Sequence, residues 1–129
     1  MKDFSEILEI LDRLMGPNGC PWDRKQTFES LRESVLEEAQ EVVEAVDEGD
    51  DAHLCEELGD LLVNVVFYCK IAEKEGRFTT VDVLNGLRDK LIRRHPHVFG
   101  DAVIETEEEL RAQWDRIKEE ERARKTSIE

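Results

Sequence analysis

Apolar side chains recur every three or four residues along most of the chain, which is the spacing of amphipathic helices. The first such stretch runs from Phe4 to Met15 and ends at the turn Gly16-Pro17-Asn18-Gly19. No stretch shows the strict alternation of a half-buried strand, and the sequence contains no internal repeat. The pattern therefore predicts an all-α fold.

Capping residues divide the rest of the chain into four further predicted helices. Asp23 with Gln26 has the spacing of a capping box, and Gly49 suits a left-handed helix stop. Thr80 is the expected N-cap of a later helix, which His95-Pro96 ends. The expected helices run from Asp23 or Thr27 to Glu48, from Asp50 or Asp51 to about Lys74, from about Thr80 to His95, and onward from Thr106, whose capping-box partner is Glu109.

The second and third predicted helices are joined by Gly49-Asp50-Asp51, which leaves room only for a tight turn. These helices should therefore form a central antiparallel pair in a bundle of four to five helices. A chain of 129 residues is one ordinary domain. We expect this domain over residues 1–120, followed by a polar tail over residues 121–129 that frays from Arg122 onward.

Acidic side chains border the apolar stripes of both central helices. With a rotation of about 100° per residue, Glu38 falls at the edge of the stripe on the second helix, with Glu41 beside it. Glu57 and Asp60 stand in the same relation to the stripe on the third helix, so packing would align four carboxylates. Glu37 falls on the expected wet face. The stripes are Leu31, Val35, Leu36, Val42 and Val46 on the second helix, and Leu54, Leu58, Leu61 and Val65 on the third.

Four carboxylates this close repel one another unless a cation compensates them. Oxygen donors without a nearby Cys favour Mg²⁺, or Mn²⁺ as a substitute, over Zn²⁺. A di-iron site would need His three residues after Glu on two helices, where this chain has Glu41 and Asp60. The other interpretation is that the acids are partly buried, salt-bridged structural groups. His53, one turn before Glu57, is expected on the surface or behind the ligands.

Basic and aromatic residues at helical spacing could hold a substrate. Lys90 and Arg94 share one face of the fourth long helix, and Trp114 and Lys118 repeat this spacing on the last. Either these cations pair with surface carboxylates, or they grip a polyphosphate that Trp114 partly covers. Trp22 is expected in the core or in a base pocket.

Composition restricts the partners and the location. The chain has 18 Lys and Arg against 32 Asp and Glu, a net charge of −14, which disfavours duplex nucleic acid. A small, highly negative ligand held through a cation stays compatible with this charge. Three cysteines cannot form a closed disulfide framework, and the longest nearly uncharged run, Leu61 to Cys69, is too short to span a membrane. A soluble cytoplasmic protein is expected.

Four motifs together resemble the MazG family of nucleoside triphosphate pyrophosphohydrolases. The resemblance covers about residues 4–120. The chain departs from the family pattern in two ways. Phe28 follows Gln26-Thr27 where the family commonly has His, and the chain has one domain where the familiar enzyme has two. The motifs are Cys20-Pro21-Trp22-Asp23 with Gln26-Thr27, Leu36-Glu37-Glu38-Ala39 with Glu41-Val42, Glu56-Glu57-Leu58-Gly59-Asp60-Leu61-Leu62, and Lys90-Leu91-Ile92-Arg93-Arg94-His95-Pro96-His97-Val98-Phe99.

The resemblance implies an all-α NTP pyrophosphatase fold and at least a dimer. It implies that Mg²⁺ directs water to the α-phosphorus of an NTP or dNTP, which releases the monophosphate and pyrophosphate. Glu38 or Glu37 would accept the proton. By position, the implied metal ligands are Glu38, Glu41, Glu57 and Asp60, and the implied nucleotide contacts are Lys90, Arg94, Trp114 and Lys118.

Two alternatives stay open at this point. One lies in the same superfamily, as a narrow-specificity dCTP/dUTP or phosphoribosyl-ATP pyrophosphohydrolase. The other is a non-catalytic acidic helical module that binds a basic protein. That module should carry its acidic residues only on solvent-exposed helix faces, whereas four acidic residues of this chain border apolar stripes.

Overall fold

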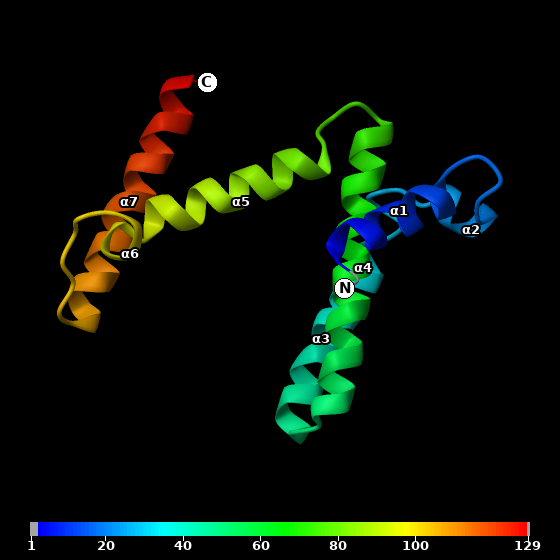
Figure 1. Ribbon diagram of the computed structural model, residues 1–129, viewed down its shortest axis with the longest axis horizontal. Coiled ribbons are helices and arrows are strands. Elements are labelled where there is room, and N and C mark those ends of the chain that lie inside the picture. The colour runs from blue at the N-terminus through cyan, green and yellow to red at the C-terminus, as the bar shows by residue number, and fades with distance from the viewer. Residues whose placement is uncertain (1–2, 129) are drawn as a thin grey trace. The chain divides into compact units, whose positions relative to one another are not determined.

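The computed structural model describes residues 3–128, and every regular element in this range is a helix (Figure 1). This confirms the predicted all-α class. Five helices have twelve residues or more, as predicted, and two are single turns of four residues. The helices are α1 (Phe4–Met15), α2 (Pro21–Arg24), α3 (Arg32–Glu48), α4 (Asp51–Lys74), α5 (Thr80–Arg94), α6 (Pro96–Phe99) and α7 (Glu107–Ile128). Within the described range, no helix is both long enough and apolar enough to cross a membrane.

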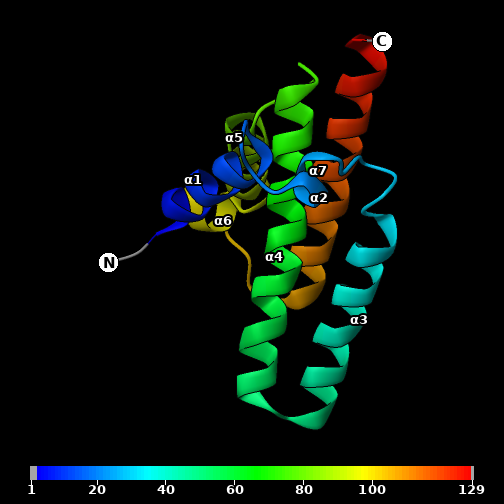
Figure 2. The ribbon, with the colours of Figure 1, turned by 90° about the vertical axis from the view of Figure 1, so that its right-hand side faces the viewer.

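The chain divides into two compact units, Met1–Val83 and Leu84–Glu129. In the first unit α3 and α4 lie side by side and antiparallel, joined by a tight turn (Figure 2). Gly49 ends α3 in the left-handed conformation with φ 70°, and the Asp50 carboxylate caps α4 by accepting from the His53 backbone N–H. The predicted central pair and its turn are therefore confirmed.

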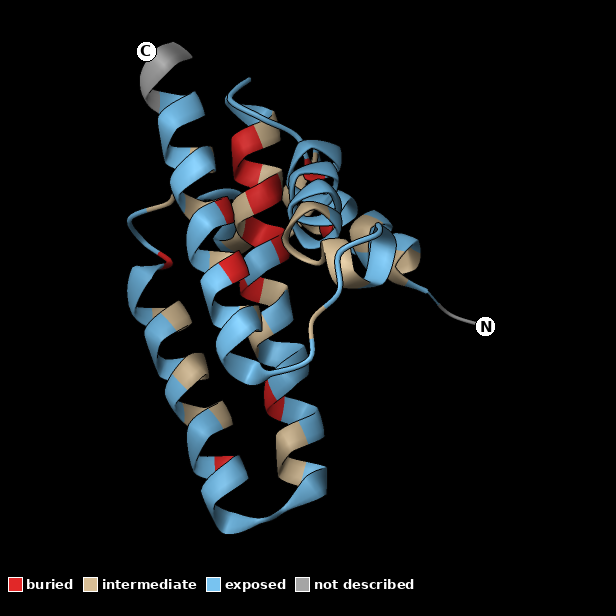
Figure 3. Ribbon diagram, turned by 90° about the vertical axis from the view of Figure 1, so that its left-hand side faces the viewer, coloured by how far each residue is buried: buried red, intermediate tan, exposed pale blue. Residues whose placement is uncertain are grey.

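The core of the first unit gathers around the second half of α4, where buried positions are concentrated (Figure 3). Phe28 packs on the ring of Tyr68, whose hydroxyl donates to the Phe28 carbonyl oxygen at 3.1 Å. This contact joins the segment before α3 to α4. The buried core residues are Leu11, Leu31, Val66, Phe67 and Ile71.

The segment between α2 and α3 differs from the prediction, because residues 25–31 are not helical. The Ser30 hydroxyl accepts from the Thr27 backbone N–H at 2.8 Å, and the Thr27 hydroxyl accepts from the Ser30 backbone N–H at 3.0 Å. This reciprocal pair satisfies the backbone in a turn and delays the helix to Arg32. Asp23 and Gln26 form no capping box, since the Gln26 amide donates to the Trp22 carbonyl instead.

The α3–α4 contact also differs from simple packing of the apolar stripes. Glu57 is 8% exposed and Asn64 is 3% exposed, whereas Leu36 is 71% exposed and Leu58 is 49% exposed. Val46 and Val65 are exposed as well. The polar edge of the pair is therefore turned into the contact, and part of each apolar stripe faces outward.

In the second unit α7 packs through Gln113 and Ile117, which are both buried. At its start, Thr106 caps the Glu109 backbone N–H as predicted. The helix continues through Ile128, so the segment from Arg122 to Ile128 is helical rather than frayed as expected.

The start of α5 corrects a further prediction. Thr79, not Thr80, caps the helix, because the Thr79 hydroxyl accepts from the Asp82 backbone N–H and the Asp82 carboxylate accepts from that of Thr79. The Thr80 hydroxyl instead donates to the Glu73 carboxylate at 2.5 Å. Thr80 therefore ties α5 to α4 within the first unit.

The left-handed conformation of Gly49 leads to a prediction about the stability of a Gly49 variant. Gly49→Ala should lower the free energy of unfolding by about 1–2 kcal/mol, because a Cβ at this φ meets the following carbonyl. Urea denaturation measures the change. As the control, Gly86→Ala lies inside α5 with open space around the new Cβ and should raise stability by about 0.5–1 kcal/mol. Equal losses in both variants would contradict the explanation.

Candidate functional site

Three of the four predicted metal-binding carboxylates meet where α3 packs against α4. Glu38 comes from α3, and Glu57 and Asp60 come from successive turns of α4, so all three share one edge of the pair. One oxygen from each lies within 4.8 Å of the other two. Glu57 is buried, Glu38 is half-buried and Asp60 is exposed, so the group opens to solvent on one side.

The fourth predicted carboxylate, Glu41, belongs to a neighbouring group that shares Glu57. The third member of this group is His53, whose Nε2 lies 3.4 Å from a Glu57 oxygen and 3.6 Å from a Glu41 oxygen. The ring is 26% exposed, so His53 is partly enclosed by acids rather than free on the surface. The sequence placed His53 one turn before Glu57 but could not show the direction of its ring.

The electrostatics of this cluster favour a cation. The Glu38 Oε2 atom is buried, and no described group donates a hydrogen bond to it. The adjacent Glu57 side chain, then burial, then the charges of Glu57, Asp60 and Glu41 together raise the pKa of Glu38 to about 7. A donor set of carboxylate oxygens around an unsatisfied buried oxygen fits a hard divalent cation.

A second, basic cluster lies within the second unit. Lys90, Arg94 and Lys118, all predicted substrate contacts, line one cavity of about 300 Å³. Among the described residues Lys90 and Lys118 form no ion pair, so their ammonium groups stay open to an anion. The structure thus brings these three cations to one cavity. The other residues lining the cavity are Arg93, Glu121, Arg122 and Lys125.

Glu121 organises the guanidinium groups of this cavity. Its carboxylate accepts from Arg94 Nη2 at 2.9 Å and from Arg93 Nε at 2.9 Å. Hydrogen bonds first from Arg94 and then from Arg93 lower the pKa of Glu121 to about 2, so it stays ionised near neutral pH. Sequence reasoning missed Glu121, since 27 residues separate it from Arg94 and no periodicity connects them.

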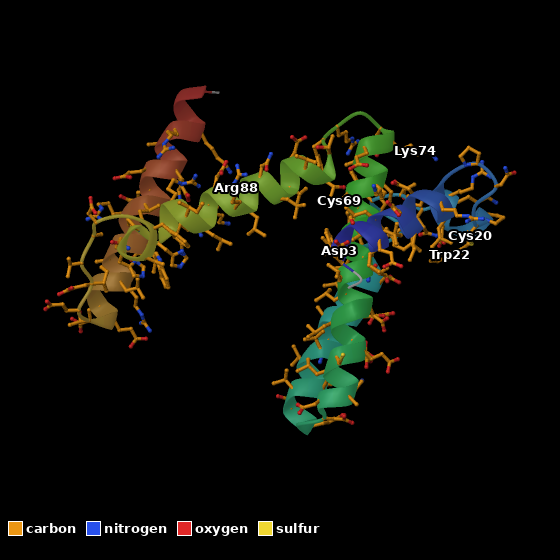
Figure 4. All side chains as sticks on the ribbon, viewed as in Figure 1. Asp3, Cys20, Trp22, Cys69, Lys74 and Arg88 are labelled. Carbon is orange, nitrogen blue, oxygen red and sulfur yellow. The ribbon has the colours of Figure 1, made fainter. Side chains whose placement is uncertain are left out.

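The aromatic candidates have different surroundings. The Trp114 indole N–H donates to the Arg94 carbonyl at 2.8 Å, and its ring meets His95 edge-on at 5.8 Å. Trp114 therefore holds the end of α5. Trp22 lies on α2 (Figure 4) and is 63% exposed, which excludes the core position considered from the sequence. Glu37 is exposed on α3 and is in none of the possible metal-binding groups among the described residues.

Comparisons with known proteins show the family of the chain. The family model of the MazG nucleotide pyrophosphohydrolase domain matches residues 26–99, the range that holds all four carboxylates. The chain is 48% identical over 124 residues to the nucleoside triphosphate pyrophosphohydrolase/pyrophosphatase MazG of Thermotoga maritima, covering 96% of this chain and 47% of the relative. It is 48% identical over 126 residues to the nucleoside triphosphate pyrophosphohydrolase of Escherichia coli K12, covering 97% and 48%.

A solved structure supports the fold. The crystal structure of a MazG-related protein from Thermotoga maritima superposes with a TM-score of 0.77 at 30% identity, covering 89% of this chain and 98% of that one. The similarity therefore extends over nearly the whole of that protein. By contrast, the chain spans about half the length of the two curated relatives above.

The raised pKa of Glu38 predicts a pH-dependent cost in stability without divalent cations. The pKa of Glu38 is about 7 in the folded state and 4.5 ordinarily. The unfolded chain therefore releases this proton first, and the fold loses stability as pH rises from 4.5 to about 7. Glu38→Gln should therefore raise the melting temperature most above pH 7 and leave it unchanged near pH 4.5. Circular dichroism melts across this range test it. Glu44→Gln, on the exposed face of α3, should show no such trend.

The lowered pKa of Glu121 predicts the opposite dependence of stability on pH. Its ionised form stabilises the fold above pH 4.5, and this contribution is lost as pH falls towards about 2. Glu121→Gln should therefore melt below the wild type at pH 7, with a difference that closes between pH 4.5 and 2. The exposed Glu120→Gln is the control. A difference that does not depend on pH would show that charge pairing is not the cause.

Proposed function

The chain belongs to the MazG nucleotide pyrophosphohydrolase domain family, and from this premise we propose that it hydrolyses nucleoside or deoxynucleoside triphosphates to the monophosphate and pyrophosphate. The observation that carries the proposal is the convergence of Glu38, Glu57 and Asp60 on the antiparallel pair α3–α4. The relatives from Thermotoga maritima and Escherichia coli are named for this activity. A role in clearing the nucleotide pool follows from such a reaction.

We propose Mg²⁺ as the cofactor, with Mn²⁺ as a substitute, held by Glu38, Glu41, Glu57 and Asp60. The unpartnered Glu38 Oε2 and the all-carboxylate donor set support this choice. When bound, the cation neutralises phosphate charge and acidifies a water molecule. The protein's part is to hold four carboxylates in a fixed arrangement on two helices, so that little reorganisation is needed.

The proposed reaction breaks the bond between the α-phosphorus and its bridging oxygen. A water oxygen forms the new bond to the α-phosphorus, and the pyrophosphate leaves with the bonding electron pair. Glu38, which lies in the cluster beside Glu57 and Asp60, is placed to accept the proton of this water. Glu37 is the weaker candidate, because it is exposed and outside the cluster.

Substrate binding is proposed for the basic cavity. Lys90, Arg94 and Lys118 would stabilise the charge that develops on the leaving pyrophosphate. Trp114 would support Arg94 through the bond to its carbonyl oxygen. Trp22 is proposed to contact the base, because its exposed indole offers a stacking surface.

We propose that the chain forms at least a homodimer and works in the cytoplasm, without nucleic acid or membrane partners, as one catalytic domain over residues 1–120. The outward apolar side chains of α3, α4 and α5 support association, because large exposed apolar patches mark interaction surfaces. The three cysteines are free, which supports a reducing compartment. The net charge of −14 disfavours duplex nucleic acid.

The reaction makes a direct prediction for two carboxylates. Glu38→Gln and Asp60→Asn should each lower pyrophosphate release by at least about 10²-fold, because they remove a proposed ligand and, for Glu38, the proton acceptor. Circular dichroism should show an unchanged helical fold. Glu44→Gln, exposed on the same helix as Glu38, should keep full turnover.

Product analysis tests which bond of the triphosphate breaks. Turnover in ¹⁸O-labelled water should give monophosphate that carries the label and unlabelled pyrophosphate, detected by mass spectrometry. Release of inorganic phosphate with a nucleoside diphosphate, or unchanged turnover in either carboxylate variant, would refute the proposed function.

A further inference from the structure

A cavity of about 400 Å³ in the first unit has no role in the proposed reaction. It lies among α2, the segment that follows α2, and the last turns of α4, and we call it the α2–α4 cavity. Its volume falls in the range of about 300–1,000 Å³ that is typical of small-molecule pockets. Its lining includes an apolar wall and four cations. The wall is Met15, Phe28 and Ile71, and the cations are Arg24, Lys25, Lys74 and Arg77.

The charge around this cavity differs from the charge of the chain as a whole. The acidic residues in its lining are Glu29 and Glu75, so the four cations leave two net positive charges, whereas the whole chain carries −14. Among the described residues, Arg24, Lys25 and Lys74 form no ion pair, although this chain has 32 acidic residues for 18 basic ones. The same three cations also line a smaller cavity of about 270 Å³. Their charge is therefore available to an anionic ligand.

The fourth cation, Arg77, is held in place by the way α4 ends. Gly76 has the left-handed conformation with φ 69°, and the Arg77 backbone N–H donates to the Ala72 carbonyl oxygen at 2.9 Å. This bond closes a Schellman motif, which turns the chain back after the helix. The Arg77 guanidinium then lies over the Phe28 ring, 4.8 Å from its centroid, and Phe28 is itself fixed by Tyr68. The cation is thus positioned without a ligand.

Arg77 keeps hydrogen-bond donors available in this position. A guanidinium that stacks on an aromatic ring still has the N–H groups at its edge for an anion. The Arg77 side chain is 56% exposed, and its Nε lies 4.0 Å from a Glu75 oxygen, which is too long for a hydrogen bond. Arginine recognises phosphate through paired, charge-assisted hydrogen bonds of this kind.

The helix ends alone do not explain this group of cations. Arg24 and Lys74 lie in the last turns of α2 and α4, where a cation interacts favourably with the helix dipole. That interaction accounts for each of these cations separately. It does not account for cations from α2, from the following segment and from both sides of the end of α4 lining one cavity together with an apolar wall.

We propose that the α2–α4 cavity binds an organic phosphate, with the phosphate group on its four cations and the organic group against its apolar wall. This position is separate from the proposed metal site. Ile71 and Lys74 follow Asp60 by 11 and 14 residues on the same helix, roughly 17–21 Å at about 1.5 Å per residue. The inference does not rest on the proposed function, because binding here needs neither a metal ion nor turnover.

Nuclear magnetic resonance of the full chain without divalent cations tests the proposal, with AMP as the organic phosphate. At constant ionic strength, the backbone amides of residues 26–29 and 75–77 should shift and reach saturation. Lys25→Gln and Lys74→Gln should each raise the Kd from these shifts by about tenfold, because each removes a charge-assisted contact. As the control, Arg13→Gln removes an exposed cation of the first unit outside the cavity and should leave this Kd unchanged.

A second ligand distinguishes an organic phosphate from free phosphate. AMP should bind at least about tenfold more tightly than inorganic phosphate, because only AMP has an organic group to bury against the apolar wall. Equal affinities for the two ligands would overturn the assignment to an organic phosphate.

Two further results would overturn the site itself. Shifts confined to residues 84–128 would show that AMP binds only in the second unit. An equal rise in Kd for Arg13→Gln and the two lysine variants would show that only the overall charge of the first unit matters. None of these measurements involves turnover, so the proposed reaction is tested separately.

Discussion

Repulsion among the carboxylates of Glu38, Glu57 and Asp60 is the constraint on which the first unit depends. These groups converge at a helix–helix contact, where ionised side chains without compensation cost several kcal/mol. The raised pKa of Glu38 and its unpartnered oxygen are the local signs of this cost. The fold tolerates this cost because apolar packing around the second half of α4 holds the helices together.

The same constraint explains which side chains face outward. With Glu57 and Asn64 occupying the contact between α3 and α4, Leu36 and Leu58 cannot also lie there, and both remain exposed. A pair built for stability alone would bury the leucines. The arrangement instead gives up intramolecular burial to bring the acids together, and it leaves an apolar surface that a second chain is proposed to cover.

The sequence predicted the parts of this structure that depend on local chemistry. The helical period, Gly49 with Asp50, and His95-Pro96 located the long helices. The helical wheels aligned four carboxylates, of which the structure brings Glu38, Glu57 and Asp60 into one group. Prediction was wrong where neighbouring polar residues compete, as between Thr79 and Thr80 for the cap of α5. It left two positions open for His53, because the direction of its ring was unknown, and it missed Glu121, because the contact with Arg94 spans 27 residues.

The tight turn at Gly49 also limits how the chain length can vary. Each residue added to a helix turns all that follows by about 100°, so one insertion between Glu41 and Glu57 would move one helix's carboxylates away from the other's. Deletions there would have the same effect, since no slack exists between Glu48 and Asp51. The spacing of these acids along the chain is thus as much a part of the site as their chemistry. The segments after Met15 and Phe99, by contrast, set no carboxylate register.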